Sequence, residues 1–481
     1  MPLAREELLA AIPPPLPVDP AQVRAALQGA RQLVVLDDDP TGTQSVADLP
    51  VLTAWSVDDL VWALDSGAPA VYVMTNSRSL DPTSAAERNR EVVRAALQAS
   101  ASLGREVDFV SRGDSTLRGH FPLEPDSIVE ELAAAGHRVD GVILVPAFPE
   151  AGRITVNSVH YAGNETDGYI PVGESEFARD ATFGYRSSDL RDWVVEKSAG
   201  LIPADQIVPL TLAVLRSAGA GDVLAGMGDS RVVVVDCADE QDLLALALAV
   251  RAAERAGRRF VFRVGPPFGR AILGQDVRSP LTAAEVGEIV AVNRDADPAQ
   301  RDARANHGLI VIGSHVDLTT RQLAALGSRR GLVEVEIDVA TVLTQGRAQH
   351  VDQVVSDVCR ALATGEVVLR TSRTLVRGSD GDDSLRIARE VSDAVVQVVR
   401  SVLQRTPPRF VVAKGGITSS DVASRGLGIG RAMVRGPMLP GLVSLWEPMT
   451  GPARGIPYIV FAGNVGDEES LADVVDILRA A

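Results

Sequence analysis

The sequence predicts an α/β protein of two domains, each built on a mainly parallel sheet. The chain has 481 residues, of which 46% are apolar and 23% charged, enough for more than one hydrophobic core. Short apolar runs rich in valine alternate with helix-like segments along most of its length. This alternation is typical of parallel sheets that are covered by helices on both faces.

A polar stretch at residues 293–306 interrupts the alternation and contains no apolar anchor. Such a composition is typical of segments between domains. We therefore predict an N-terminal domain of residues 1–292, a linker of residues 293–306 and a C-terminal domain of residues 307–481.

The strands predicted in the first domain are short apolar runs that end at glycine, proline or polar clusters. Helices are predicted to begin near Asp19, Ser56, Asp81 and Asp239, where an acid or serine precedes a helix-like pattern. Residues 157–201 are poorer in periodic pattern, so we predict a long loop or insertion there. The predicted strands lie at 33–36, 50–53, 70–74, 107–110, 142–145, 232–236 and 260–263.

The second domain repeats the same pattern, and its clearest helix is predicted over residues 387–403. Its strands are predicted at 309–312, 333–337, 367–371, 410–413 and 458–461. In parallel sheets, ligands bind beyond the carboxyl ends of the strands, so the residues that follow these runs are the candidates for a site.

Three adjacent acids, Asp37 to Asp39, follow the first buried strand and precede a Pro-Thr-Gly turn. Because neighbouring carboxylates repel one another, this arrangement favours a site where a cation or a substrate hydroxyl uses them. Asp38 and Asp39 are the catalytic candidates. An exposed acidic turn, capped by Asp39, is the alternative interpretation.

Arginines and hydroxyl groups follow the next strands and are candidates for binding an anionic substrate, because arginine matches carboxylates and phosphates in a bidentate manner. Pairing of each arginine with one surface acid, and capping of a helix by Asp114, are the alternatives. The substrate-binding candidates are Thr41, Arg78, Asp114, Ser115, Arg118 and Arg153.

Small residues follow three strands of the second domain, at Gly313-Ser314, at Lys414 to Ser420 and at Ala462 to Gly466. Glycine lets backbone N–H groups approach an anion closely, so three such turns in one domain favour a polyphosphate site over plain turns. There is no P-loop sequence. The nucleotide-binding candidates are Ser314, Lys414, Gly415, Gly416, Ile417, Thr418, Gly463 and Asn464.

The formal net charge of -16 argues against a nucleic-acid partner or an anionic membrane surface, since both are met with basic surfaces. Two cysteines, Cys237 and Cys359, cannot form a disulfide framework and fit a reducing cytoplasm. No apolar run reaches the length of a membrane span. No spacing typical of a zinc site occurs, so metal ligands are not assigned.

Five spaced motifs together resemble the signature of the four-carbon acid sugar kinase family, over a span from about Leu33 to the C-terminus. The sequence departs from that signature at Asp37 and Pro40, where alanine and leucine are commoner, and at Ile417, where an acid is frequent. These departures bear on the identity of the substrate. The motifs are Asp38 to Gly42, Asp114 to Gly119, Gly313-Ser314, Gly415 to Ser419 and Gly463-Asn464.

The resemblance implies an enzyme that uses ATP to phosphorylate a terminal hydroxyl of a four-carbon sugar acid or its keto form. It implies that the first domain binds the sugar acid, with Arg118 foremost on its carboxylate, that the second binds ATP, and that both ligands meet in the cleft between the domains. Mg²⁺ is expected from the chemistry of phosphoryl transfer. A metal-dependent lyase or hydratase and a sugar-acid sensor without turnover are the alternatives. We also expect a homodimer.

Overall fold

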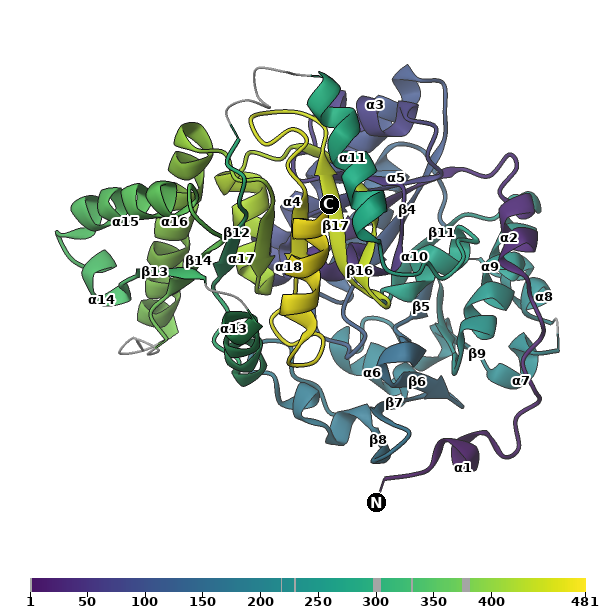
Figure 1. Cartoon of the computed structure of the whole chain (residues 1–481). Helices are drawn as coiled ribbons and strands as arrows, with labels where there is room; N and C mark the ends of the chain where they lie inside the picture. Colours follow the sequence, from purple (N-terminus) through teal and green to yellow (C-terminus); the bar gives the residue numbers. More distant parts are fainter. Residues whose placement is uncertain (1, 218, 229–230, 297–303, 330–331, 374–380) are drawn as a thin grey trace. The chain divides into compact units, whose positions relative to one another are not determined.

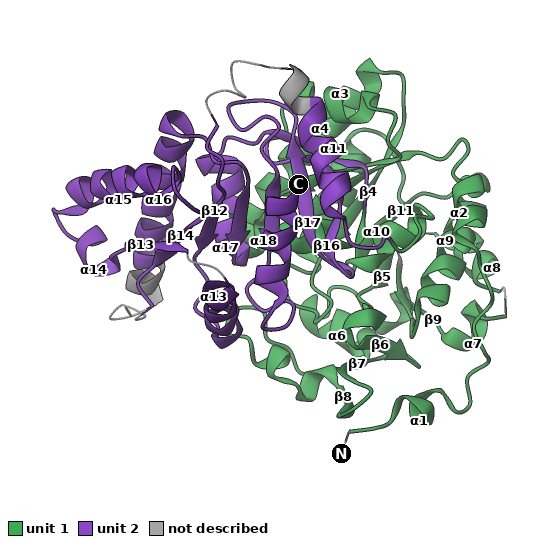
Figure 2. Cartoon of the chain, in the orientation of Figure 1, with its two compact units in different colours: residues 1–46, 55–277 green, residues 47–54, 278–481 purple. Residues whose placement is uncertain are grey.

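In the computed structural model the chain folds into two compact units (Figure 2). The first contains residues 1–46 and 55–277, and the second residues 47–54 and 278–481. The structure describes residues 2–217, 219–228, 231–296, 304–329, 332–373 and 381–481.

The division between the units differs from the predicted linker. Helix α11 (Ala283–Ala296) contains residues 293–296, whereas residues 297–303 lie outside the described part. Val286 and Val290 of α11 are buried in the same apolar cluster as Val474 and Leu478. The polar stretch therefore begins at the end of a helix that belongs to the second core, and the chain passes between the units earlier, at residues 277 and 278.

The sheet of the first unit is entirely parallel, with the strand order β3-β1-β4-β11-β5-β10-β9. Valine and other apolar residues bury both faces of these strands, as the near-continuous apolar runs predicted. The strands are β1 (Gln32–Asp37), β3 (Ala70–Met74), β4 (Val107–Arg112), β5 (Gly141–Val145), β9 (Ile207–Leu210), β10 (Arg231–Val235) and β11 (Phe260–Val264).

The larger helices of the first unit pack in two groups, α3 with α4 and α5, and α9 with α2, α8 and α10 (Figure 1). Four of them begin where predicted, because Asp19, Ser56, Asp81 and Asp239 cap α2, α3, α4 and α9. The helices are α1 (Arg5–Leu9), α2 (Pro20–Ala26), α3 (Val57–Asp65), α4 (Pro82–Ser102), α5 (Leu123–Ala134), α6 (Leu190–Lys197), α7 (Leu212–Leu215), α8 (Ala220–Ala225), α9 (Glu240–Arg255) and α10 (Pro267–Ile272).

The predicted loop at residues 157–201 is an ordered insertion. A small antiparallel sheet forms from β6 (Arg153–Val156), β7 (Val159–Asn164) and β8 (Gly168–Pro171), and α6 follows it. The buried Asp236 carboxylate anchors this sheet, since it accepts hydrogen bonds from the backbone N–H groups of Asn157 (2.7 Å), Ser158 (2.7 Å) and Leu212 (3.1 Å).

The sheet of the second unit has the order β13-β14-β12-β15-β18-β17-β16-β2. Its first five strands are parallel, as predicted, and the last three are antiparallel. The strands are β2 (Leu49–Leu52), β12 (Leu309–Ile312), β13 (Val333–Ile337), β14 (Val367–Thr371), β15 (Val411–Lys414), β16 (Arg431–Leu439), β17 (Leu442–Pro448) and β18 (Tyr458–Phe461).

Strand β2 lies in the first half of the sequence but pairs with β16 in the second unit, with Val51 opposite Ala432. Helices α15 and α16 pack together near the β13 edge (Figure 1). In the described part of the chain, no helix combines the length and apolarity that a bilayer span requires. The helices of this unit, besides α11, are α13 (Asp317–Arg329), α14 (Val339–Val342), α15 (Arg347–Ala361), α16 (Gly381–Arg405), α17 (Gly416–Asp421) and α18 (Ser470–Ala480).

Replacement of Asp236 by alanine is expected to destabilise the first unit, because three backbone donors would lose their acceptor in a buried position. We expect Asp236→Ala to lower the free energy of unfolding by about 3 kcal/mol in denaturant titrations. Asp205→Ala, which changes an exposed acid in the same unit, is the control and should stay within about 0.5 kcal/mol of the parent. Equal stability of the two variants would contradict the anchoring role.

Candidate functional site

The acids that follow β1 lie beside the arginines that follow β3 and β4. Strand β1 pairs in parallel with both neighbours, so Asp37 lies opposite Met74 on one side and Arg112 on the other. The carboxyl ends of the three strands therefore meet at one edge of the sheet. Of these three strands, β4 is labelled in Figure 1.

Asp38 is buried and bound by arginines. Arg78 forms a bidentate pair with it, through Nη2 at 2.6 Å and Nε at 3.1 Å. Arg112 Nη1 lies 3.4 Å from Asp38 Oδ1, and Arg263 Nη2 lies 4.0 Å from Oδ2. The side chain of Asp38 is only 2% exposed, so it holds together arginines from three different strands and loops.

Asp39 combines two roles that the sequence presented as alternatives. Its Oδ1 accepts hydrogen bonds from the backbone N–H of Thr41 (2.9 Å) and from the Thr41 hydroxyl (2.6 Å), and so caps a 3₁₀ turn, η1 (Pro40–Ser45). Its Oδ2 lies 3.5 Å from Arg78 Nη1, and its side chain is 23% exposed. Burial raises the pKa of Asp39, but Arg78, Arg112 and the Thr41 hydrogen bonds outweigh it and hold that pKa below its ordinary value.

Asp37 is the most deeply buried of the three acids and pairs with Arg112 Nε at 2.7 Å. Burial, together with the charges of Asp38 and Asp39, outweighs Arg112 and raises the pKa of Asp37 to about 8. Gly42 leaves room for this pair, since a Cβ atom there would lie 1.9 Å from Asp37 Oδ2. Asp37 and Asp38 are therefore not part of an exposed acidic turn.

Arg263 and Glu124 belong to the same cluster, although the sequence motifs did not indicate them. Arg263 Nη1 pairs with Glu124 Oε2 at 2.5 Å and donates to Ser111 Oγ at 2.8 Å. The Ser77 hydroxyl donates to the other oxygen of Glu124. The available signal was an arginine inside the apolar run of β11, which must find a buried partner.

The segment Asp114 to Gly119 forms a compact loop after β4. Asp114 accepts hydrogen bonds from Arg118 Nε (2.6 Å) and from the Thr116 hydroxyl. Burial opposes ionisation, but Arg78, Arg118 and the Thr116 hydrogen bond hold the pKa of Asp114 at about 2. Asp114 thus binds within its own loop rather than capping a long helix. The Ser115 side chain is buried.

The small antiparallel sheet is hydrogen-bonded to this loop through His160. His160 of β7 is fully buried, and its Nε2 donates to the Ser115 carbonyl oxygen (2.8 Å) while Nδ1 accepts from the Thr155 hydroxyl (2.8 Å). The Tyr185 hydroxyl donates to the Thr116 carbonyl oxygen at 2.7 Å. Burial lowers the pKa of His160 to about 4, so it is neutral near pH 7. The sequence did not indicate either residue.

Arg118 and Arg153 both lie over the ring of Phe177, each with its guanidinium carbon 5.4 Å from the ring centre. Arg118 also lies 3.9 Å from Asp180 Oδ2. Burial lowers the pKa of Arg153, although Asp114 partly opposes this. The arrangement brings all the predicted substrate-binding residues of the first domain to the carboxyl edge of one sheet.

In the second unit the three glycine turns lie side by side. Strands β12, β15 and β18 are neighbours in parallel register, with Ile312 opposite Lys414 and Lys414 opposite Phe461. A Cβ atom at Gly313 would lie 2.1 Å from Thr418 Oγ1, and one at Gly463 would lie 2.5 Å from Ser314 Oγ. Predicted nucleotide-binding residues from all three turns are therefore in direct contact.

The positions of the remaining nucleotide-binding candidates differ. Gly415 has a φ of 126°, which favours glycine, and Gly416 begins α17. Ile417 and Asn464 are exposed to solvent, and the exposed fraction of Ile417 is 60%. Thr319 was not predicted, but its hydroxyl donates to the Gly463 carbonyl oxygen at 2.9 Å and can accept from the Ser314 hydroxyl, 3.1 Å away, which links two of the turns.

Lys414 is fully buried rather than exposed beside the glycines. Its ammonium donates to the Ala462 carbonyl oxygen (3.0 Å) and lies 3.9 Å from the centre of the Phe461 ring. Burial lowers the pKa of Lys414 to about 7. This placement favours a role in holding the third turn, and a direct contact of Lys414 with phosphate stays a prediction.

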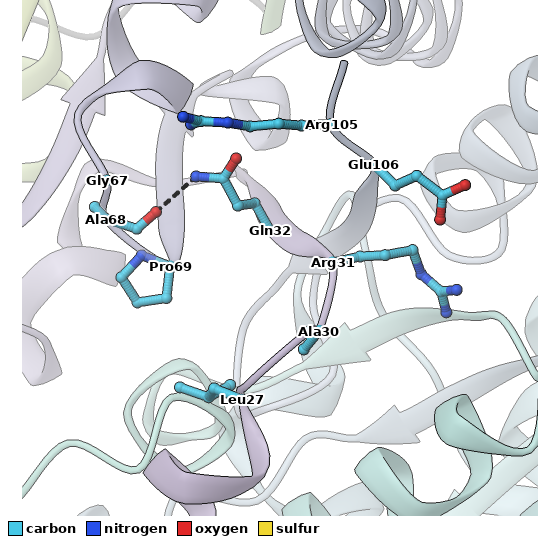
Figure 3. Close-up of a pocket in the computed structure, with 10 residues that line it drawn as sticks. Leu27, Ala30, Arg31, Gln32, Gly67, Ala68, Pro69, Arg105 and Glu106 are labelled. Carbon is cyan, nitrogen blue, oxygen red and sulfur yellow. Dashed lines mark hydrogen bonds between the residues drawn. The ribbon is translucent and has the colours of Figure 1, made fainter. Parts of the chain in front are cut away.

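A separate cavity of about 560 Å³ lies at the amino ends of β1, β3 and β4 (Figure 3). Its arginines are already bound, since Arg31 pairs with Asp108 (2.6 Å) and Arg105 with Asp65 (3.2 Å). None of the predicted site residues lines it, so it lies at the opposite end of the strands from the candidate site. Figure 3 labels Leu27, Ala30, Arg31, Gln32, Gly67, Ala68, Pro69, Arg105 and Glu106 around it.

Two family models match the chain, the sugar-binding N-terminal domain over residues 33–272 and the nucleotide-binding C-terminal domain over residues 309–471. A D-erythronate kinase of Heliobacterium modesticaldum is 24% identical over 93% of this chain and 97% of its own length. A D-threonate kinase of Cupriavidus necator is 29% identical over 93% of this chain and 92% of its own. The crystal structure of a Haemophilus influenzae protein has a similar fold, with a TM-score of 0.62, 18% identity, and coverage of 92% and 98% of the two chains.

The neutral, buried His160 makes the first unit less stable at acidic pH. Its pKa is about 4 in the folded chain against an ordinary 6.5, so between these values the unfolded chain binds the extra proton. Neutral His160 therefore contributes fully to the free energy of unfolding above pH 6.5. This contribution is lost as the pH falls toward 4, and the loss is on the order of 3 kcal/mol. His160→Gln should therefore lose less stability than the parent between pH 6.5 and 4 in denaturant titrations.

The control for this experiment is His137→Gln, which changes a less buried histidine of the same unit. It should keep the acid dependence of the parent. If the free energy of unfolding of His160→Gln changes with pH as it does in the parent and the control, a buried neutral His160 is not the cause of the acid dependence.

Proposed function

We propose that this chain, which belongs to the four-carbon acid sugar kinase family, transfers the γ-phosphoryl group of ATP to a hydroxyl of a four-carbon sugar acid. The observation that carries the proposal is the adjacency of three glycine turns in the second unit, in contact through Gly313, Thr418, Ser314 and Gly463. An arginine and acid cluster in the first unit supplies the complementary site for a hydroxy acid.

The glycine turns suit a polyphosphate because they offer backbone N–H groups without side chains that would block an anion. The hydroxyls of Ser314 and Thr418 stand at the same place and add neutral donors. Lys414 would act by positioning the third turn through the Ala462 carbonyl oxygen. These local donors are needed because the net charge of -16 gives no general attraction for a nucleotide.

In the first unit, we assign different roles to the two catalytic candidates. Both oxygens of Asp38 are engaged by Arg78, so Asp38 positions the arginines. Among the described residues, Asp39 Oδ2 has one weak contact, to Arg78 at 3.5 Å, and Asp39 is the more exposed of the two acids. Its lowered pKa keeps it ionised, so it can accept and orient the substrate hydroxyl that attacks the phosphoryl group.

Magnesium fits this arrangement as an ion that arrives with the nucleotide. Mg²⁺ in phosphoryl-transfer sites is held mostly by phosphate oxygens, water and one or two carboxylates. Among the described residues, no group of three or more histidine, cysteine, aspartate or glutamate side chains could hold a metal ion. The ion would neutralise charge on the transferred phosphoryl group.

The alternative of a metal-dependent lyase requires Asp37 to Asp39 to bind an ion. Asp37 and Asp38 pair instead with Arg112 and Arg78, at 2.7 and 2.6 Å, so arginines rather than a metal ion already occupy these two acids. The sensor alternative differs from the kinase only in turnover. The cytoplasmic location, the homodimer and the meeting of both ligands in one cleft stay predictions.

Release of ADP tests the proposed activity and separates it from a sensor. We expect ADP when the chain is mixed with Mg-ATP and one of a panel of four-carbon acids that includes D-erythronate, D-threonate and their keto forms. A sugar acid that binds in calorimetry but gives no ADP would support the sensor instead. If no member of the panel binds and none gives ADP, the proposal is overturned.

Substitution of the two acids by asparagine should separate orientation of the substrate from support of the cluster. We expect Asp39→Asn to reduce kcat by about a hundredfold to ten-thousandfold, the usual range for such a group, with a melting temperature close to that of the parent. Asp38→Asn should also reduce turnover, and it should lower the melting temperature by at least about 5 °C because buried arginines lose their partner.

The two variants serve as controls for each other, because the residues are adjacent and the change is the same. Parent turnover in Asp39→Asn under saturating substrates would exclude it as the orienting group. An unchanged melting temperature in Asp38→Asn would show that the arginines do not depend on its charge.

A further inference from the structure

We propose that Arg153 is the residue that binds the carboxylate of the sugar acid. This inference rests on the proposed function and deepens it, because it names the group that distinguishes an acid from a neutral sugar alcohol. It also replaces the expectation that Arg118 is foremost in this role.

Five other arginines at the carboxyl ends of the first sheet already have a carboxylate partner. Arg118 pairs with Asp114 at 2.6 Å and has Asp180 as a second neighbour. These arginines are therefore engaged by side chains of the protein before any ligand binds. The remaining pairs are Arg78 with Asp38 at 2.6 Å, Arg112 with Asp37 at 2.7 Å, Arg263 with Glu124 at 2.5 Å and Arg270 with Glu150 at 2.5 Å.

Arg153 differs from all of these. Among the residues that the structure describes, its guanidinium contacts the Ala151 carbonyl oxygen through Nη1 and the ring of Phe177, with no carboxylate at ion-pair distance. Its Nε atom is buried and has no hydrogen-bond partner. The side chain is itself partly buried at the first residue of β6.

A partly buried guanidinium without a counter-ion is unfavourable, and arginine cannot relieve this by losing its proton. A carboxylate or phosphate ligand would relieve it, because the planar fork forms two parallel hydrogen bonds with such a group. The contacts with Ala151 and Phe177 hold the fork in place, so little side-chain freedom would be lost on binding.

The position of Arg153 also suits a small hydroxy acid. Arg153 and Arg118 both lie over the ring of Phe177, and Arg118 is hydrogen-bonded to Asp114. Asp114 interacts with Arg153 electrostatically, although it does not pair with it directly. A ligand carboxylate on Arg153 would therefore place the hydroxyls of a four-carbon chain within the cluster that contains Asp114 and Arg78.

A binding cycle with two ligands and one substitution tests this assignment. The ligands are the four-carbon acid that the ADP screen identifies and its neutral carboxamide, and calorimetry measures both. The parent should bind the acid more tightly. Arg153→Gln should weaken binding of the acid by about tenfold to a hundredfold and should bind acid and amide alike, because a charge-assisted pair is lost.

Two further variants and one further measurement make the result specific. Arg186→Gln, at an arginine side chain that is 91% exposed, should keep the preference of the parent for the acid. Arg153→Lys retains the charge without the fork and should show an intermediate preference. The affinity for Mg-ATP should be unchanged in Arg153→Gln, which also reports that this variant is folded.

The outcomes separate this inference from the proposed function. If ADP is released but Arg153→Gln still prefers the acid as strongly as the parent, Arg153 is not the carboxylate site. If Arg118→Gln removes the preference while Arg153→Gln keeps it, the role belongs to Arg118. If no acid binds the parent at all, the proposed function fails and this inference fails with it.

Discussion

The burial of charge at the carboxyl edge of the first sheet is the constraint on which the candidate site depends. Removing charged groups from water costs several kcal/mol for each ion, and only close pairing offsets this. Asp37 and Asp38 are almost completely buried, and each has an arginine within 2.7 Å. Loss of the Asp38 carboxylate would leave Arg78 and Arg112 without this partner, so the cluster forms as a unit. Gly42 is part of it, because any side chain there would occupy the place of the Asp37 carboxylate.

Pairing within this cluster decides which groups remain for a ligand. Asp38 and Arg112 are committed to their partners, whereas Asp39 Oδ2 and the Arg153 guanidinium have only weak or neutral contacts. In a protein with a net charge of -16, such local differences decide where an anion binds. The chemistry of the site is therefore set by the few charges that the fold leaves unbalanced, and not by the number of charges present.

The insertion with the small antiparallel sheet has a clear place in this scheme. It contributes Arg153 and Phe177, and its His160 supports the loop of Asp114 through the Ser115 carbonyl oxygen. A neutral imidazole suits this position because both of its nitrogens are satisfied, one as donor and one as acceptor. In the second unit, hydroxyl groups and an ammonium hold the glycine turns in place. The hydroxyls are those of Thr319 and Ser314, and the buried ammonium is that of Lys414.

The sequence by itself determined the features that depend on neighbours along the chain. Apolar runs of four or five residues predicted the parallel strands, and capping residues predicted helix starts. The polar residues after the strands stay predictions of a site. Helix α11 was the main local error, since its polar end resembled a linker. Only the tertiary structure decided that β2 joins the second unit and that residues 157–201 are an ordered insertion. It also decided that Arg118 is paired with Asp114, whereas Arg153 has no carboxylate partner among the described residues. The physical reason is that strand and helix patterns are set by residues a few positions apart, whereas the partner of a buried charge comes from elsewhere in the chain, as Arg112 does for Asp37 and Arg263 for Glu124.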